Sequence, residues 1–209
     1  MNLFRKKRGT DIVQRWEGNP LIDICDLDFK CSDIYNAGIA IYKEEILLLI
    51  TIEHLSGRRH IHLARPVKDG SYRIEKKPLL SPSEQPEYKP HEINGVLDGR
   101  VTCIEGTHYI LYDAFGEHGY RLGLAKTNDF RSVERIALIS EPDTKAGLLF
   151  GKKIKGRFAR LERPCSDNSI WITYSDDLIY WGQSELVMTP RGGFWDSDRI
   201  GAGSIQETE

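Results

Sequence analysis

The chain has 209 residues and a formal net charge of −2 at pH 7, which fits one domain that buries its own core without disulfide bonds. A charge so near zero gives no indication of nucleic acid or a membrane surface as a partner. No apolar run approaches the roughly 20 residues that cross a bilayer, and the basic start lacks the apolar stretch of a secretory signal. We therefore expect a soluble, cytoplasmic protein.

Short strand-like runs separated by turns fill the chain from Ile34 onward. They fall into three sets of four. The strands are predicted at 34–41, 46–52, 60–65 and 72–75 in the first set, at 100–104, 109–114, 120–125 and 133–139 in the second, and at 146–150, 157–161, 170–174 and 185–188 in the third. The stretch 79–90, which contains three prolines, is predicted to be an extended loop.

One phrase recurs after the third strand of each set. The strand leads to Asp-Gly at Asp69, to Asp-Phe at Asp129 and to Asp-Leu at Asp177. Recurrence at this period is the signature of a repeat architecture. An Asp in such a turn can accept hydrogen bonds from its own backbone. We therefore interpret these aspartates as structural rather than catalytic.

Repeated sets of four sequential strands are typical of a β-propeller, in which roughly 4–8 such blades surround an axis. The predicted fold is therefore all-β, a single incomplete propeller domain over 1–209. An N-terminal segment, three blades and the first strand of a fourth are predicted at 1–20, 33–78, 95–140, 145–190 and 199–209, with that last strand at Arg199 to Ile205. An open arc of blades exposes sheet edges, so a truncated form of a longer protein and a possible homo-oligomer are both expected.

Motifs between the repeats resemble, in order, those of one carbohydrate-active family. They are Arg15-Trp16-Glu17-Gly18-Asn19-Pro20, Tyr35-Asn36-Ala37-Gly38, Gly95-Val96-Leu97-Asp98-Gly99-Arg100, Arg160-Leu161-Glu162-Arg163-Pro164 and Ile200-Gly201-Ala202-Gly203. Together they resemble glycoside hydrolase family 130, the five-bladed propeller mannoside phosphorylases and mannosidases. Leu97, Gly99 and Thr51 depart from the family's pattern, which has Glu, Pro and a basic residue at these places.

The resemblance implies a phosphorylase, or a C-terminally truncated part of one, that cleaves β-mannosides with inorganic phosphate. The reaction would invert the anomeric centre and give α-mannose 1-phosphate, which by reaction type suggests a glycosyltransferase. The implied partners are a β-mannoside oligosaccharide and phosphate as co-substrate, with no cofactor and no metal. An inverting hydrolase needs an acid and a base, whereas phosphate is already an anionic nucleophile, so one acid and a cationic cradle suffice.

The resemblance also implies roles for single residues. Asp98 would be the general acid, delivering its proton through a sugar hydroxyl. Lys145 and Arg163 would hold the phosphate, because Arg can grip it with two parallel hydrogen bonds and Lys supplies a point charge. The candidate sugar contacts are Asn36, Tyr112 and Arg100.

Two other functions stay open at this point. A mannosidase of the same family would need a carboxylate to activate water, and Glu92 and Glu117 are the candidates. A truncated propeller could instead be a non-catalytic glycan- or protein-binding surface. His60 and His62 share one face of a predicted strand, a spacing that can bind metal, but no third ligand is evident and no metal site is predicted.

Overall fold

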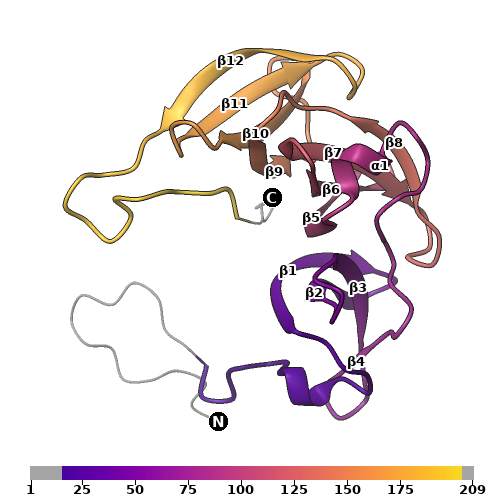
Figure 1. Ribbon diagram of the computed structural model, residues 1–209. Helices are drawn as coiled ribbons and strands as arrows, with labels where there is room; N and C mark the ends of the chain where they lie inside the picture. The colour runs from indigo at the N-terminus through magenta and orange to yellow at the C-terminus, as the bar shows by residue number, and fades with distance from the viewer. Residues whose placement is uncertain (1–15, 204–209) are drawn as a thin grey trace.

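The computed structural model describes residues 16–203, and over these residues the chain is all-β, as predicted (Figure 1). The strands form two sheets. The first contains β1 (Asp33–Tyr42), β2 (Glu45–Glu53), β3 (Arg59–Pro66), β4 (Tyr72–Ile74), β5 (Gly95–Ile104), β6 (Thr107–Gly116), β7 (Gly119–Thr127) and β8 (Glu134–Leu138), and the second contains β9 (Thr144–Leu149), β10 (Phe158–Pro164), β11 (Ile170–Ser175) and β12 (Trp181–Met188).

Consecutive strands pair antiparallel within three groups: the first group is β1–β4, the second β5–β8 and the third β9–β12. The first two groups join into one sheet through a parallel pairing of Arg59 with Gly95. The groups follow one another along an arc in Figure 1, from β1–β4 at the bottom to β9–β12 at the top. Every predicted strand of the three sets is present, whereas the number of blades stays a prediction.

Both faces of β2 are covered, which explains its unbroken apolar run. Leu47 and Leu49 pack into a core shared with β3, β5, β6 and β7. Leu48 and Ile50 belong to a second core, which the N-terminal residues Ile22, Leu27 and Phe29 help to cover. Because side chains alternate across a strand, a strand that is buried on both faces reads as a continuous apolar run.

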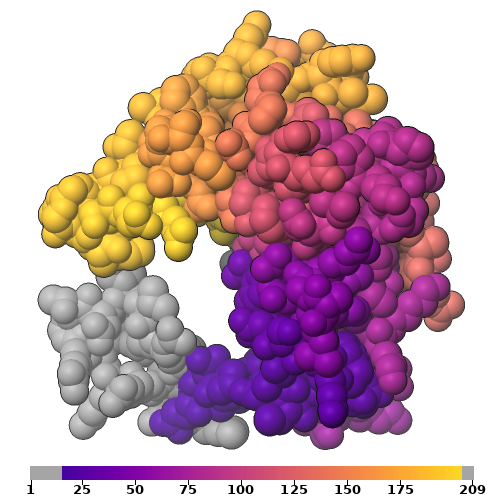
Figure 2. All heavy atoms as spheres, viewed as in Figure 1, coloured from indigo at the N-terminus to yellow at the C-terminus, as the bar shows by residue number. Residues whose placement is uncertain are grey.

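A third core connects the two sheets. Leu111 of β6 and Leu122 of β7 pack there with Leu149 of β9 and with Leu178 from the turn before β12. The third group is thereby fixed against the second. Figure 2 shows that the molecule is hollowed on the side where the C-terminal segment, in yellow, turns back toward the N-terminal strands, in indigo.

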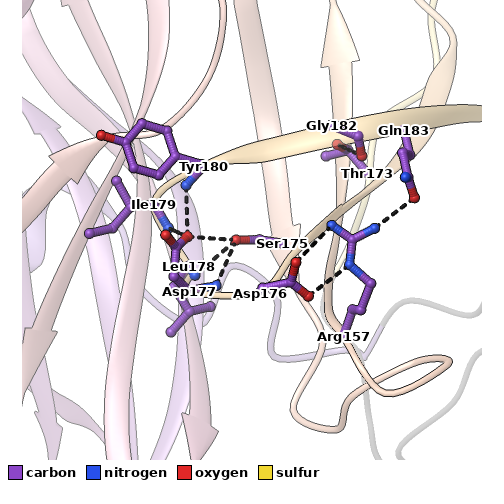
Figure 3. A network of polar contacts seen from close by, with 10 residues as sticks. All are labelled: Arg157, Thr173, Ser175, Asp176, Asp177, Leu178, Ile179, Tyr180, Gly182 and Gln183. Atoms are coloured by element: carbon purple, nitrogen blue, oxygen red, sulfur yellow. Dashed lines mark hydrogen bonds and ion pairs between the residues drawn. The ribbon is translucent and has the colours of Figure 1, made fainter.

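The three repeated aspartates are turn residues, as predicted. Asp177 Oδ1 accepts hydrogen bonds from the backbone N–H groups of Ile179 and Tyr180, both at 2.9 Å (Figure 3). Asp129 and Asp69 accept equivalent bonds within their own turns. Hydrogen bonds to the ionised form hold the pKa of each of these carboxyls below its usual value. The residue after each Asp is left-handed: φ is 86° at Gly70, 51° at Phe130 and 68° at Leu178.

Two expectations about irregular segments need correction. The strand predicted at 199–205 is not formed in its described part, residues 199–203, because no neighbouring strand pairs with it. Among the described residues, its backbone–backbone hydrogen bonding is limited to the Ile200 N–H, which donates to Asn168 O. Residues 204–205 and 1–15 lie outside the described range. The predicted loop 79–90 ends in a short helix, α1 (Lys89–Glu92), and a 3-10 turn, η1 (Ile24–Asp26), precedes β1. Among residues 16–203, no helix has the length and apolar character of a membrane span.

Three histidines, His54, His60 and His62, lie together at the β2–β3 turn and the start of β3. The rings of His54 and His60 are 4.0 Å apart, and His54 Nε2 lies 2.9 Å from His62 Nε2. Burial, reinforced by the two neighbouring histidines, lowers the pKa of His60 to about 4. In the residues that the structure describes, no group of three or more His, Cys, Asp or Glu side chains is arranged to hold a metal ion.

The lowered pKa of His60 predicts that the fold loses stability in acid. Because the folded pKa of His60 lies below the usual 6.5, the unfolded chain takes up the proton first as the pH falls. Stability is therefore complete above about pH 6.5 and declines toward pH 4, by about 1–2 kcal/mol after allowance for the half-exposed ring. Urea unfolding at both ends of this window should show a smaller decline for His60→Gln than for the wild type; equal declines would contradict this role.

Candidate functional site

The first strand of each group carries the same β-bulge. Two residues stand opposite one residue of the next strand in all three: 36–37 opposite Ile50, 98–99 opposite Tyr112 and 146–147 opposite Glu162. One residue of each bulge is left-handed, with φ of 49° at Asn36, 55° at Asp98 and 53° at Ala146. Bulges redirect side chains and are frequent next to active sites, and positive φ outside glycine costs about 1–3 kcal/mol. The three bulges therefore mark the candidate site.

Asp98 and Asn36 meet at this point. The Asn36 amide Nδ2 donates to Asp98 Oδ1 at 2.9 Å. The Asp98 backbone N–H donates to Thr51 Oγ1, also at 2.9 Å, and Thr51 is completely buried. The amide and the hydroxyl thereby hold the aspartate in place while its side chain stays partly exposed. A carboxyl fixed in this way can exchange a proton with a bound ligand.

Close backbone contact brings the first two bulges together. A Cβ on Gly38 would lie 1.9 Å from Gly99 O, so β1 can approach β5 only with glycine at residue 38. Arg100 extends the contact, because its guanidinium donates to Ala37 O at 3.0 Å. Arg100 thus connects the same two bulges that present Asn36 and Asp98.

The residue just before each bulge pairs with a residue of the next strand, and this partner has the same place in all three groups. Thr51 pairs with Tyr35, Asp113 with Leu97, and Arg163 with Lys145. The first two of these opposing residues anchor the next bulge along the chain. Thr51 Oγ1 accepts from the Asp98 N–H, and Asp113 Oδ1 accepts from the Ala146 N–H at 3.0 Å. A neutral hydroxyl and a carboxyl therefore perform the same structural task in neighbouring groups.

Asp113 is a buried carboxyl, with 1% of its surface exposed. Desolvation, followed by the nearby charge of Asp98, raises the pKa of Asp113 to about 8, against the opposing effects of Lys145, the Ala146 N–H and Arg163. Asp113 is therefore mostly protonated at neutral pH. The charges of Asp98, Lys145 and Arg163 all act on this one carboxyl.

Lys145 and Arg163 face each other across β9 and β10. The Lys145 ammonium lies 4.1 Å from the centroid of the Tyr120 ring. Arg163 donates from one terminal nitrogen to Ile200 O at 3.2 Å, while its buried Nε has no hydrogen-bond partner among the described residues. The pair offers positive charge and a spare donor to an anion.

An aromatic and polar wall adjoins these charges. Tyr120 stacks on Phe115 at 4.6 Å, and the Arg59 guanidinium lies 5.6 Å from the Phe115 ring. Arg59 also donates to Tyr35 Oη at 3.3 Å and pairs with Glu53 at 2.8 Å. Burial raises the pKa of Tyr120, with a further contribution from Asp113, so its hydroxyl stays protonated. Stacked rings next to hydrogen-bonding groups suit the apolar and polar faces of a sugar.

The prediction that Tyr112 contacts a sugar is wrong. Tyr112 is 1% exposed, and its hydroxyl donates to Glu92 Oε1 at 2.7 Å inside the core. Its apolar neighbours explain this position, since it fills the space opposite the Asp98 bulge. Glu92 is likewise no free base, because it is fully buried and paired with Arg135 at 2.7 Å. Glu117 is exposed in the β6–β7 turn.

The sequence interpretation missed Asp113, Tyr120, Arg59 and Tyr35. Asp113 carried a usable signal, because it is the one charged residue within the apolar run Tyr109 to Phe115. A charged group seldom occupies a buried strand position unless it is paired or its pKa shifts. Tyr120 and Arg59 gave no comparable signal, since both residue types are common on exposed strands.

Carboxyl, amide and cationic groups lie near aromatic rings at the bulges of this all-β scaffold, a combination of groups that occurs in carbohydrate-active proteins. Residues 4–208 match the model of glycoside hydrolase family 130, described as "beta-1,4-mannooligosaccharide phosphorylase". The chain belongs to this family. Its membership corrects one expectation, because the family is classed with glycoside hydrolases and not with glycosyltransferases.

Individual relatives are phosphorylases by name. A beta-1,2-mannobiose phosphorylase of Listeria innocua is 25% identical over 92% of this chain and 70% of its own length. A beta-1,4-mannooligosaccharide phosphorylase of Ruminococcus albus is 27% identical over 93% of this chain and 60% of its own length. The solved Listeria innocua beta-1,2-mannobiose phosphorylase, in complex with beta-1,2-mannobiose, superposes with a TM-score of 0.81 and 25% identity over 100% of this chain and 73% of that one. The chain thus spans between three fifths and three quarters of these relatives.

Proposed function

We propose that the chain carries the acid and the phosphate-binding residues of a β-mannoside phosphorylase. Its three strand groups would be three blades of a five-bladed propeller. One observation carries the proposal: the buried Asp113 pairs with Leu97 beside Asp98 and accepts the N–H of Ala146, which follows the Lys145 that pairs with Arg163. An acid and two cations therefore surround one place, as phosphorolysis requires. A cytoplasmic location and a homo-oligomer remain predictions from the sequence.

The chemistry follows from these positions. Phosphate, held by Lys145 and Arg163, attacks the anomeric carbon of a β-mannoside on the face opposite the glycosidic oxygen. The bond from carbon to that oxygen breaks with inversion, and its electron pair stays on the leaving oxygen. Asp98 supplies a proton to this oxygen through a sugar hydroxyl. The proton that phosphate releases then protonates Asp98 again. The products are α-mannose 1-phosphate and a shortened acceptor sugar.

Asn36 and Arg100 complete the proposed sugar site in different ways. Asn36 is exposed and uses one amide hydrogen on Asp98, so its carbonyl oxygen and second hydrogen are available to sugar hydroxyls. Arg100 spends one donor on Ala37 O and has further donors for a ligand. Asn36 lies in the first bulge and Arg100 directly follows the second. The Gly38–Gly99 contact holds these two bulges together.

A phosphate-dependence assay tests the proposed function. The chain is incubated with β-1,2- and β-1,4-linked mannobiose, with and without inorganic phosphate. We expect α-mannose 1-phosphate only when phosphate is present. Release of free mannose at the same rate without phosphate would mean hydrolysis, and absence of both products with both substrates would contradict catalysis by this chain.

Removing one cation of the cradle should weaken phosphate binding specifically. Hydrogen bonds to charged groups contribute about 1.5–3 kcal/mol, so Lys145→Met is expected to raise the KM for phosphate by about 10- to 100-fold. The KM for mannobiose should change far less. Lys68→Met, on the exposed β3–β4 turn, is the matched control. An unchanged phosphate KM in Lys145→Met would remove this residue from the cradle.

A further inference from the structure

Asp113 has an ionisable carboxyl that its structural task does not need. Its bond to the Ala146 N–H is the counterpart of the Thr51 bond to the Asp98 N–H. Thr51 performs this task with a neutral hydroxyl and is equally buried. A carboxyl in the second group therefore adds a titratable group at a position where the fold itself only requires a hydrogen-bond acceptor.

Asp113 lies among charged and titratable groups: it pairs with Leu97 beside Asp98, and it accepts the N–H of Ala146, which follows the Lys145 that pairs with Arg163. Asp98 approaches from β5, Lys145 from β9 and Arg163 from β10, while Tyr120 from β7 and Cys165 after β10 also interact with it electrostatically. Burial raises the pKa of Tyr120 and of Cys165, so both stay neutral near pH 8. The charges that shift the pKa of Asp113 are those of Asp98, Lys145 and Arg163.

The two cations have two alternative counter-charges. When Asp113 is ionised, its carboxylate balances Lys145 and Arg163. When an anion binds to the same cations, two negative charges would be placed close together in a buried environment, which is unfavourable. A proton on Asp113 removes the conflict and leaves both cations available.

We infer that Asp113 couples anion binding to proton binding: an anion held by Lys145 and Arg163 takes the place of the Asp113 carboxylate as their counter-charge, and a proton from solvent binds to that carboxylate. This inference rests on the proposed phosphate cradle. It adds that the cradle is strongest when Asp113 is protonated and weakens as Asp113 ionises. Asp113 is then a positioning residue that keeps the cations available, and it touches no reacting atom.

The direction of the effect follows from linkage. Without an anion the pKa of Asp113 is about 8, and a bound anion raises it further. The proton must strengthen anion binding by the same factor, typically about 5- to 150-fold for coupled sites. Affinity for an anion of constant charge should therefore fall as the pH rises through 8 to 9.

Sulfate is the suitable probe, because it stays a dianion throughout this range whereas phosphate itself titrates. Calorimetric titrations at about pH 6.5 and about pH 9 remain below the ordinary pKa of lysine. For the wild type we expect the Kd for sulfate to increase by about 4- to 10-fold across this window. Titrations near pH 8.5 in two buffers of different ionisation enthalpy should show uptake of about 0.4–0.8 proton per sulfate.

Asp113→Thr is the decisive variant, since Thr51 shows that this position accepts a threonine that bonds the next bulge. In Asp113→Thr, sulfate affinity should be independent of pH across the window, and proton uptake should vanish. The buffer comparison on the wild type needs no variant, so the inference stays testable if Asp113→Thr is unstable. Equal pH dependence in both proteins, or no proton uptake by the wild type, would overturn the coupling while leaving the cradle in place. If sulfate binding is absent, or is not abolished in Lys145→Met, the cradle itself is overturned, and the coupling with it.

Discussion

We expect the Asp98→Asn variant to lose phosphorolysis by about 10²- to 10⁴-fold, the usual contribution of a general acid. Asparagine keeps the shape of the side chain, and its carbonyl oxygen can still accept the hydrogen bond from Asn36. The left-handed backbone at this residue also tolerates asparagine well. The transferable proton is lost, together with the carboxylate charge that acts on Asp113. The measurement is the initial rate of α-mannose 1-phosphate release from mannobiose at saturating phosphate.

A substrate with a better leaving group sharpens this test. A β-mannoside of dinitrophenol needs no proton on its leaving oxygen, so Asp98→Asn should retain most of the wild-type rate with it. The control is Asp176→Asn, which removes a carboxyl that is 79% exposed and pairs with Arg157 on the surface. If Asp98→Asn is as active on mannobiose as this control, Asp98 is not the acid.

Removing the Glu92 carboxylate should produce the largest loss of stability. Glu92 is fully buried, and its oxygens accept bonds from Arg135, from the Tyr112 hydroxyl and from the Ser83 N–H. Glu92→Ala leaves the Arg135 charge without a partner in a largely buried position, at a cost of about 3–5 kcal/mol. Urea unfolding at neutral pH measures the change in the free energy of unfolding.

Two comparisons identify the cause of that loss. Glu84→Ala breaks the exposed pair between Glu84 and Lys89, whose side chains are 70% and 51% exposed, and should leave stability almost unchanged. A double variant, Glu92→Leu with Arg135→Met, should recover part of the stability, because an apolar pair needs no counter-charge. A loss in Glu92→Ala no greater than in Glu84→Ala would contradict a structural role for the pair.

The strands could be predicted from the sequence, but the bulges could not. An apolar run such as Ile46 to Ile52 predicts a buried strand directly, because such a run pairs and packs in almost any sheet. The start of β5 was predicted at Arg100, whereas the strand begins at Gly95. The five residues between them include Asp98 and its bulge, where local hydrogen bonding is irregular and the period-two pattern is lost.

The site was only partly predictable for a related reason. Asp98, Lys145 and Arg163 were proposed because their motifs resemble those of a known family. Tyr112 was misplaced because a tyrosine in an apolar strand can face either the core or a ligand, and its partner Glu92 is 20 residues away in a short helix. Asp113 went unnoticed because its importance depends on cations from β9 and β10, which only the folded structure brings near.

The repeated bulge has a consequence for how this kind of site can change. The left-handed Asp98 and Ala146 are each held by a backbone N–H bond to the preceding strand group, and this bond does not depend on which side chain the residue carries. Asn36, Asp98 and Ala146 show an amide, an acid and a methyl group on the same backbone shape. A single substitution at one bulge can therefore alter the chemistry presented there while the other two stay as they are. Diversity of substrates within such a scaffold needs no new loops.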